Sequence, residues 1–443
     1  MLAAPRLITP SALACTALAL ILMLPTGAQA RGRATVPGEV VVGYAAAAGE
    51  AHAARASGPP APRVIRTRDV AATLRRLRRQ PGVRYAVPNV VAHASEAFVP
   101  NDPGETPEPA GWQQTQWNFT GPASVNAPEA WGNLISVGRP GGRGVVVAVL
   151  DTGVAYRTFG KTPASPDLSG THFVRGYDFI GKDQYANDRN GHGTHVTSTI
   201  AESTNNGLGL TGLAYGATIM PIKVLDDEGN GDAYEIARGV RLAARRGAKV
   251  INLSLEFSTR VTRSDIPQLV DAIDYAHGQG AVVVAASGNE ADVKVAYPAR
   301  ASYVISVGST TEHGCLSDFS NQGTGLDIVA PGGGPDAYLT DPGCQPDAPA
   351  GRNIFQLTLT GTHRDRFGIP RSYDGTSMAV PHVSAGAALV VASGVLGPDP
   401  SPAAIERRLE RTATDLGAPG LDPRYGYGRL NAGAATSAAI PVT

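Results

Sequence analysis

The sequence predicts an α/β fold, a mostly parallel sheet with helices on both faces. Runs of Val, Ile, Ala and Leu are apolar at nearly every position, as is typical of strands covered on both sides. Segments with the spacing of amphipathic helices separate several of these runs, as crossovers between parallel strands require. The predicted strands are 145–151, 218–226, 249–255, 281–287 and 303–309, and the clearest helices are 235–246 and 268–277.

The N-terminus has the pattern of a secretory signal peptide. Arg6 precedes an apolar run over 12–24, and Ala28-Gln29-Ala30 is a small-x-small cleavage site. A lipid anchor at Cys15 is rejected because most of the apolar run follows that cysteine. We therefore expect residues 1–30 to be removed and the protein to be secreted without a stable membrane anchor.

Cysteine usage fits an exported protein. Of three cysteines, Cys15 belongs to the signal peptide, which leaves Cys315 and Cys344 as a pair. In an oxidising compartment such a pair predicts a disulfide. Two buried free thiols are the alternative.

Charge divides the chain into two parts. Residues 1–94 contain twelve Arg, no Lys and three acids, which gives 12 − 3 = +9, so the rest of this neutral chain carries −9. Opposite charges favour docking of the two parts on each other. The charge pattern indicates an internal partner and gives no case for nucleic acid.

The basic part forms a small unit of its own. It begins and ends with strand-like segments, and between them 70–79 places Val70, Leu74 and Leu77 on one helical face. The sequence therefore predicts a small α+β domain over 31–95 with strand, helix, strand order, followed by a large domain over 96–443.

Three short motifs carry the chemistry. Asp151 follows an apolar strand and opens D-T-G, His192 opens H-G-T-H, and Ser377 lies in G-T-S-M-A at a helix start. A turn aspartate or a helix-capping serine is common when it occurs alone. Together, a carboxylate, an imidazole that titrates near neutrality and a hydroxyl are the groups of nucleophilic catalysis.

With these motifs in this order, the chain resembles the subtilisin-like serine proteases, or subtilases. The resemblance implies a subtilisin-like fold and a secreted serine endopeptidase that works through an acyl-enzyme. It assigns the oxyanion-hole side chain to Asn289 in A-A-S-G-N. An inactive binding protein is the first alternative, although none of the four residues is lost. An esterase with the same triad is the second, although the G-x-S-x-G motif of α/β-hydrolases is missing.

Two segments match the family's substrate-binding edges, and two acids stand out near them. The matching residues are Gly229, Asn230, Gly231, Ser254, Leu255 and Glu256. The family usually has glycine at the position of Glu256, and Glu290 follows the oxyanion asparagine near the floor of the S1 pocket. We expect both carboxylates to border the site and to favour basic or polar substrate side chains.

The small N-terminal domain is similar to the inhibitory propeptides of subtilases, which often end in Val-Ala-His-Ala, here residues 91–94. The resemblance implies an intramolecular chaperone and inhibitor that the enzyme itself removes, with the cut between Ala94 and Asn101. An accessory domain that stays attached is the alternative. Protein or peptide substrates and this propeptide are the expected partners.

One loop resembles a family calcium site. In T-N-N-G-L-G-L, the side chain of Asn206 and the carbonyls of Leu208 and Leu210 would face the ion, and Asp102 and Asp167 would add carboxylates. An Asn-Gly turn without metal is the alternative, and no organic cofactor is implied. Zinc at His192 and His195 is rejected, because no third ligand and no intervening glutamate follow the zinc-protease pattern.

Overall fold

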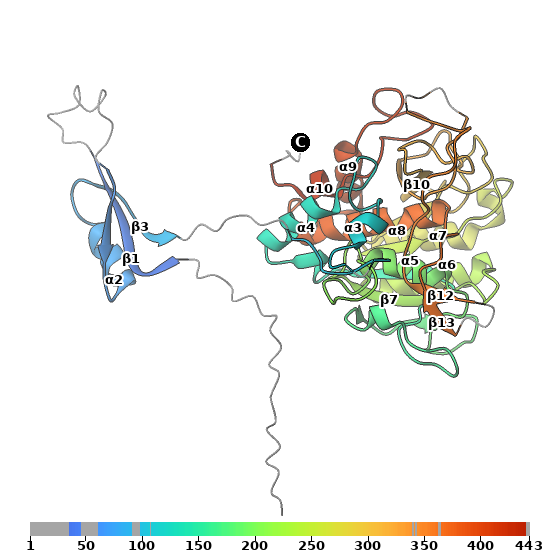
Figure 1. The fold of residues 1–443 in the computed structure, drawn as a ribbon, viewed down its shortest axis with the longest axis horizontal. Helices are drawn as coiled ribbons and strands as arrows, with labels where there is room; N and C mark the ends of the chain where they lie inside the picture. The colour runs from blue at the N-terminus through green and yellow to red at the C-terminus, as the bar shows by residue number, and fades with distance from the viewer. Residues whose placement is uncertain are drawn as a thin grey trace, which may run out of the picture. The chain divides into compact units, whose positions relative to one another are not determined.

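The computed structural model describes residues 35–45, 61–90, 98–106, 108–338, 341, 343–361 and 365–439. The chain divides into two compact units, Met1–Glu96 and Ala97–Thr443 (Figure 1). The predicted signal peptide and the Val-Ala-His-Ala run lie outside the described residues, as do residues 94–97 of the predicted cleavage region.

The first unit is a three-stranded antiparallel sheet with one helix. Strands β1 (Thr35–Tyr44), β2 (Arg63–Arg66) and β3 (Val83–Val90) lie in the order β2-β1-β3. Helix α2 (Val70–Leu77) begins where the Asp69 carboxylate accepts the N–H of Ala72. Sequence reasoning missed β2, because R-V-I-R is too short to show a strand pattern.

Strand and helix of this unit share a small core. Leu77 packs with Val40, Val42 and Ala86, which are all buried. The spacing that predicted one apolar helix face therefore describes the contact between α2 and the sheet.

An eight-stranded sheet organises the second unit. Its order is β11-β10-β9-β8-β4-β7-β5, with β6 also beside β7, and every pair is parallel. The fold is the predicted α/β fold. The strands are β4 (Val146–Asp151), β5 (His172–Phe173), β6 (Tyr177–Asp178), β7 (Thr218–Lys223), β8 (Val250–Leu253), β9 (Val282–Ala286), β10 (Val304–Thr310) and β11 (Ile328–Pro331).

Helices cover both faces of this sheet (Figure 1). Helices α6 (Ala233–Arg245) and α7 (Pro267–Gly278) pack on the face that contains Leu150. Helices α5 (His192–Ala201) and α8 (Thr376–Ser393) share the other core, with Val149 and its neighbours. Successive strand residues point to opposite faces, so strands apolar at every position serve both cores.

The remaining elements include helices that add buried residues to the core around α5 and α8. They are α3 (Trp112–Thr115), α4 (Ala127–Ser136), α9 (Pro402–Thr412), α10 (Ala432–Thr436), three 3₁₀ turns (Pro140–Gly142, Pro166–Leu168 and Arg263–Asp265) and the pair β12 (Thr358–Thr360) and β13 (Arg366–Gly368).

Helix α8 is the central helix of the second unit. By length and composition it is the one candidate membrane span among the described residues, yet 78% of it is buried. It contacts strands β4, β8, β9, β10 and β11. Its apolar character is thus that of a core helix.

The topology places the site. Strand β4 is central, and later strands lie on both sides of it, β7 on one side and β8 on the other. A crevice forms at the carboxyl ends of strands where the order reverses. Asp151 is the last residue of β4, Ser254 follows β8, and Asn289 lies shortly after β9.

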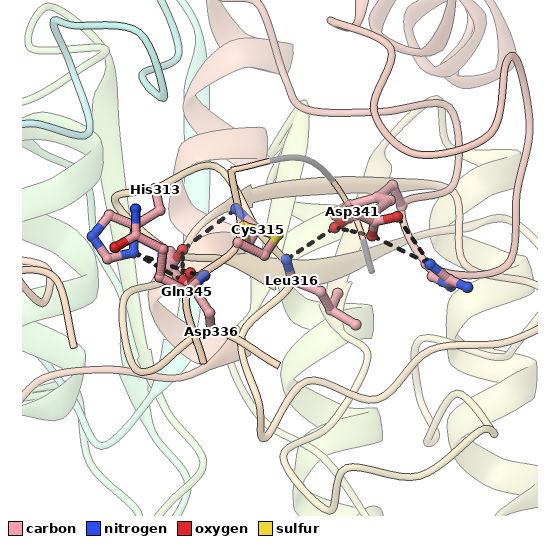
Figure 2. The surroundings of a disulfide bond; sticks show 10 residues. His313, Cys315, Leu316, Asp336, Asp341 and Gln345 are labelled. Carbon is pink, nitrogen blue, oxygen red and sulfur yellow. Dashed lines mark hydrogen bonds and ion pairs between the residues drawn. A yellow bond between two sulfur atoms is a disulfide. The ribbon is translucent and has the colours of Figure 1, made fainter. Parts of the chain in front are cut away.

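Cys315 and Cys344 form a disulfide, with their Cα atoms 5.6 Å apart. Figure 2 shows its surroundings: the Asp336 carboxylate lies 3.1 Å from the His313 ring and accepts the backbone N–H of Gln345 at 2.7 Å. The bridge attaches segment 332–373 to the loop that follows β10.

The same segment is attached to the helix that begins with His192. The Ser198 hydroxyl donates to the carbonyl of Leu357 at 3.2 Å, and the Thr358 hydroxyl donates to the carbonyl of Gly191. Next to the segment, the N–H of Gly375 donates to the carbonyl of Gly332 at 3.0 Å. These contacts thus place segment 332–373 next to the residues that flank His192 and Ser377.

Candidate active site

Asp151 is the last residue of β4 and leads into a tight turn. Its side chain is 0% exposed, and its Oδ1 accepts the N–H of Thr152 at 2.7 Å. Gly153 permits the turn because its φ is +106° and a Cβ there would meet the carbonyl of Asn187. A buried carboxylate that is held in one orientation can in turn orient a second side chain.

That second group is His192. Its Nδ1 lies 2.7 Å from Asp151 Oδ1, and its side chain is 24% exposed. Gly193 is required next to it, since a side chain there would collide with the carbonyl of Gly153. Burial opposes protonation, but the charge and hydrogen bond of Asp151, together with the charge of Asp188, raise the pKa of His192 above its ordinary value.

Asp188 holds the two catalytic segments together, and sequence reasoning missed it. Its buried carboxylate accepts the Thr152 hydroxyl at 2.9 Å, the Thr194 hydroxyl at 2.6 Å and the N–H of Gly191 at 3.0 Å. Asp188 therefore fixes the strand end that carries Asp151 relative to helix α5. Its place in D-R-N-G-H-G was the available signal.

Ser377 lies in the first turn of α8. Gly375 has φ +145°, which favours glycine, and it brings the chain into the helix. The Ser377 hydroxyl donates to the carbonyl of Ser254 at 3.3 Å, and the Ser254 hydroxyl donates to the carbonyl of Ser377 at 2.9 Å. These paired contacts fix the serine against the end of β8. Catalytic hydrogen bonds are often long or poorly aligned in a free enzyme.

Asn289 follows β9, and its side chain lies beside the start of α8. Its Oδ1 accepts from Thr376, at 2.8 Å from the backbone N–H and 3.0 Å from the hydroxyl. Its Nδ2 donates to Glu256 Oε2 at 3.1 Å. The side-chain amide is therefore held from both ends beside the start of α8.

One cavity of about 440 Å³ unites these groups. His192, Ser377 and Asn289 line it, together with all six predicted edge residues, Gly229, Asn230, Gly231, Ser254, Leu255 and Glu256. Asp151 lies behind His192, out of contact with solvent. A hydroxyl, an imidazole and a side-chain amide thus face one space beside two polypeptide edges.

Glu290 differs from the expectation that two carboxylates border the site. Its side chain is exposed and accepts the N–H of Thr259 at 3.1 Å. Among the described residues that line the cavity, Glu256 is present and Glu290 is not. The hydrogen bond from Thr259 thus holds the Glu290 carboxylate outside the cavity lining.

His195 has a structural environment. It stacks on Tyr373 with ring centroids 4.2 Å apart, and its Nε2 lies 3.0 Å from the carbonyl of Ile354. Burial lowers its pKa to about 3, so the ring is neutral. These contacts connect α5 to segment 332–373.

The predicted calcium residues Asp102 and Asp167 are both 0% exposed. Asp102 accepts the N–H groups of Asn205 at 2.8 Å and Asn206 at 3.0 Å. Asp167 accepts the side-chain amide of Asn206 at 2.7 Å and the N–H of Leu210 at 3.0 Å. The structure thus brings the loop and both carboxylates together, and Leu208 lies in the same loop with its side chain 42% exposed.

Glu202 adds a third acid that sequence reasoning missed. It is 0% exposed, and it interacts with the carboxyl group of Asp167 and with the backbone of Leu357. Burial, and then the charge of Asp167, raise its pKa, while burial raises the pKa of Asp167 to about 7. Buried acidic oxygens without a counter-charge fit a hard cation such as Ca²⁺.

A buried Asp-His pair beside a helix-borne serine, at the carboxyl ends of strands, is the arrangement of a triad serine hydrolase. The model of the Subtilase family matches residues 142–428. The chain therefore belongs to the subtilase family, and it is a subtilisin-like serine endopeptidase.

Sequence similarity to known proteases covers most of the chain. It is 34% identical over 368 residues to a thermophilic serine proteinase of Bacillus sp. (strain AK1), covering 83% of this chain and 76% of that protein. It is 35% identical over 335 residues to thermitase of Thermoactinomyces vulgaris, covering 76% and 98%. Among solved structures, a protease from Pseudoalteromonas arctica PAMC 21717 has a TM-score of 0.62 and 30% identity, covering 77% of this chain and 100% of that one.

Proposed function

We propose that this protein is a secreted endopeptidase, made as a zymogen, whose catalytic triad is Asp151, His192 and Ser377. The observation that carries the proposal is the 2.7 Å contact between Asp151 and His192 in a cavity that His192 shares with Ser377. Asn289 completes the site as the oxyanion donor.

In the proposed mechanism, His192 Nε2 takes the proton of Ser377 as Oγ bonds to the scissile carbonyl carbon. Asp151 keeps Nδ1 protonated and stabilises the imidazolium. The carbonyl oxygen becomes negative and accepts from Asn289 Nδ2 and from the N–H of Ser377, at the positive end of α8. His192 then gives its proton to the leaving amine as the C–N bond breaks, and water releases the acyl group by the same steps.

The two edges position the substrate. Residues 229–231 and 254–256 are separate in the sequence, but both segments line the same cavity. An extended peptide between them would gain backbone hydrogen bonds as an added strand. Protein and peptide chains, which can adopt this conformation, are the proposed substrates.

The N-terminal unit is proposed as the propeptide. It is a separate compact unit, and residues 1–94 carry +9 against −9 for the rest of the chain. Its last described strand, β3 (Val83–Val90), leads directly into the predicted cleavage region. Secretion through the signal peptide 1–30 would deliver this precursor.

Calcium is proposed as a structural ion. Asp102, Asp167 and Asn206 would hold it with the carbonyls of Leu208 and Leu210. Its charge would offset the buried carboxylates, and it would tie the residues before α3 to the loop after α5.

Intact mass over time tests the proposal. Full-length chain without its signal peptide is refolded with calcium beside a Ser377→Ala control. Loss of a fragment that ends between residues 94 and 101 in the wild type alone supports the nucleophile and the propeptide together. Identical cutting of both chains argues for an outside protease. No cutting, with casein also intact, contradicts the proposed activity and favours an inactive binding protein.

A further inference from the structure

The proposed oxyanion donor already has an anionic partner. Asn289 Nδ2 donates to Glu256 Oε2 at 3.1 Å, while Asn289 Oδ1 is held by two hydrogen bonds from Thr376. The amide cannot turn away without breaking the bonds to Thr376. The Asn289 amide, which is proposed to stabilise the transition state, thus already donates a hydrogen bond to a carboxylate.

Glu256 is half-buried and lacks a counter-charge. None of the ion pairs among the described residues involves it. Burial raises the pKa of Glu256, the hydrogen bonds from Asn289 oppose this, and the charge of Glu290 adds to it. A carboxylate in this position gains most from a cation that enters the cavity.

The reaction develops a second negative charge at this position. The oxyanion must accept from Asn289, so an ionised Glu256 next to that amide repels it. A positive substrate side chain would neutralise Glu256 and remove this repulsion. The side chain best placed is that of P1, the residue that supplies the scissile carbonyl, because its stem begins on the carbon next to the reacting centre.

We propose that Glu256 selects substrates with Lys or Arg at P1, by pairing with their charge and leaving Asn289 free to stabilise the oxyanion. The proposal rests on the proposed function and names its substrate class. Glu256 lies on the substrate-binding edge and lines the cavity with Ser377. Glu290 accepts the N–H of Thr259 and is not among the residues that line the cavity, so its charge acts on Glu256 but does not meet the substrate.

Paired peptides test this inference. They differ only at P1, with Lys in one and norleucine, which has the same stem without the charge, in the other. For the mature enzyme obtained from the full chain, with active sites titrated by a serine-reactive phosphonate, we expect kcat/KM for Lys to exceed that for norleucine by at least about tenfold. Glu256→Gln should reduce this ratio to about one, chiefly by raising kcat for norleucine and lowering kcat/KM for Lys.

Two matched variants complete the design. Glu256→Gly restores the residue usual in the family and should also abolish the preference, whereas Glu290→Gln should leave the Lys to norleucine ratio as in the wild type. A wild-type ratio near one, or a ratio that survives Glu256→Gln, overturns the selectivity while both peptides are still cleaved. Absence of cleavage of every peptide, with no phosphonate labelling, contradicts the proposed function instead.

Discussion

With His192 as the proposed base, we predict that its hydrogen bond with Asp151 sets the lower pH limit of activity. Because Asp151 and Asp188 raise the pKa of His192, and only the neutral imidazole can accept the proton of Ser377, protonation stops catalysis. We expect kcat/KM to fall on acidification with a midpoint above the ordinary value of 6.5. A pH profile on one peptide measures this.

The same profile for Asp151→Asn provides the contrast. This variant should lose activity by roughly 10⁴-fold, because the imidazole loses its preferred tautomer. Its remaining acidic limb should shift to lower pH. A midpoint that does not move would show that Asp151 does not control the titration.

Asn289 should act on kcat and little on KM. Asn289→Ala removes the amide donor, and we expect kcat to fall roughly 10²- to 10³-fold, since the donor contributes mainly in the transition state. Thr376→Val keeps the amide but removes one of its two anchors, so a smaller loss is expected. Steady-state kinetics separates the two constants; a change confined to KM would contradict the oxyanion role.

At the scale of single residues, short sequence motifs predicted the catalytic groups but not their contacts. Asp151, His192 and Ser377 were recognisable because each lies in a short motif at a strand end or helix start. The contact of Glu256 with Asn289 depends on a side-chain direction that no motif encodes. Glu202 was missed for a similar reason, since its burial beside Asp167 is visible only in three dimensions.

At the scale of elements, the disulfide should stabilise the fold by lowering the conformational entropy of the unfolded chain. It closes a loop between residues 29 positions apart, and such a loop contributes roughly 3 to 4 kcal/mol. We expect Cys315→Ala with Cys344→Ala to lower the free energy of unfolding by this amount, measured by denaturant titration. Reductant should lower the stability of the wild type and leave the double variant unchanged; equal effects on both would contradict the bridge.

Element prediction succeeded where patterns were long. The five predicted strands became β4, β7, β8, β9 and β10, with ends shifted by a few residues. β11 was missed because I-V-A-P is four residues long and ends in proline. The attachment of segment 332–373 to α5 through Ser198 and Thr358 was also unpredictable, because single hydroxyl contacts leave no periodic signal.

For the whole molecule, calcium should contribute to stability. Removal of the ion leaves Asp102, Asp167 and Glu202 buried without a counter-charge. A ligand at 100 times its dissociation constant stabilises a fold by about 2.7 kcal/mol, so we expect EDTA to lower Tm by roughly 5 °C. Differential scanning calorimetry of Ser377→Ala, which prevents self-digestion, measures this shift.

Glu202 should increase that calcium effect. Glu202→Gln in the same background removes one buried acid, so the rise in Tm on adding calcium should be smaller than without the change. Asp271→Asn, which alters an exposed acid on α7, is the matched control and should keep the full rise. Equal rises in all three proteins would show that Glu202 does not act on the ion.

The place of Ser377 at the start of the central helix has a consequence during synthesis. Ribosomes make His192 first and Ser377 only 377 − 192 = 185 residues later, a delay of roughly 10 to 40 s at about 5–20 residues per second. Because α8 contacts β4 and β8 to β11, those strands cannot complete their core before α8 emerges. A growing chain therefore contains the proposed acid and base long before the proposed nucleophile. If these roles hold, a truncated translation product that ends before α8 cannot cut its neighbours.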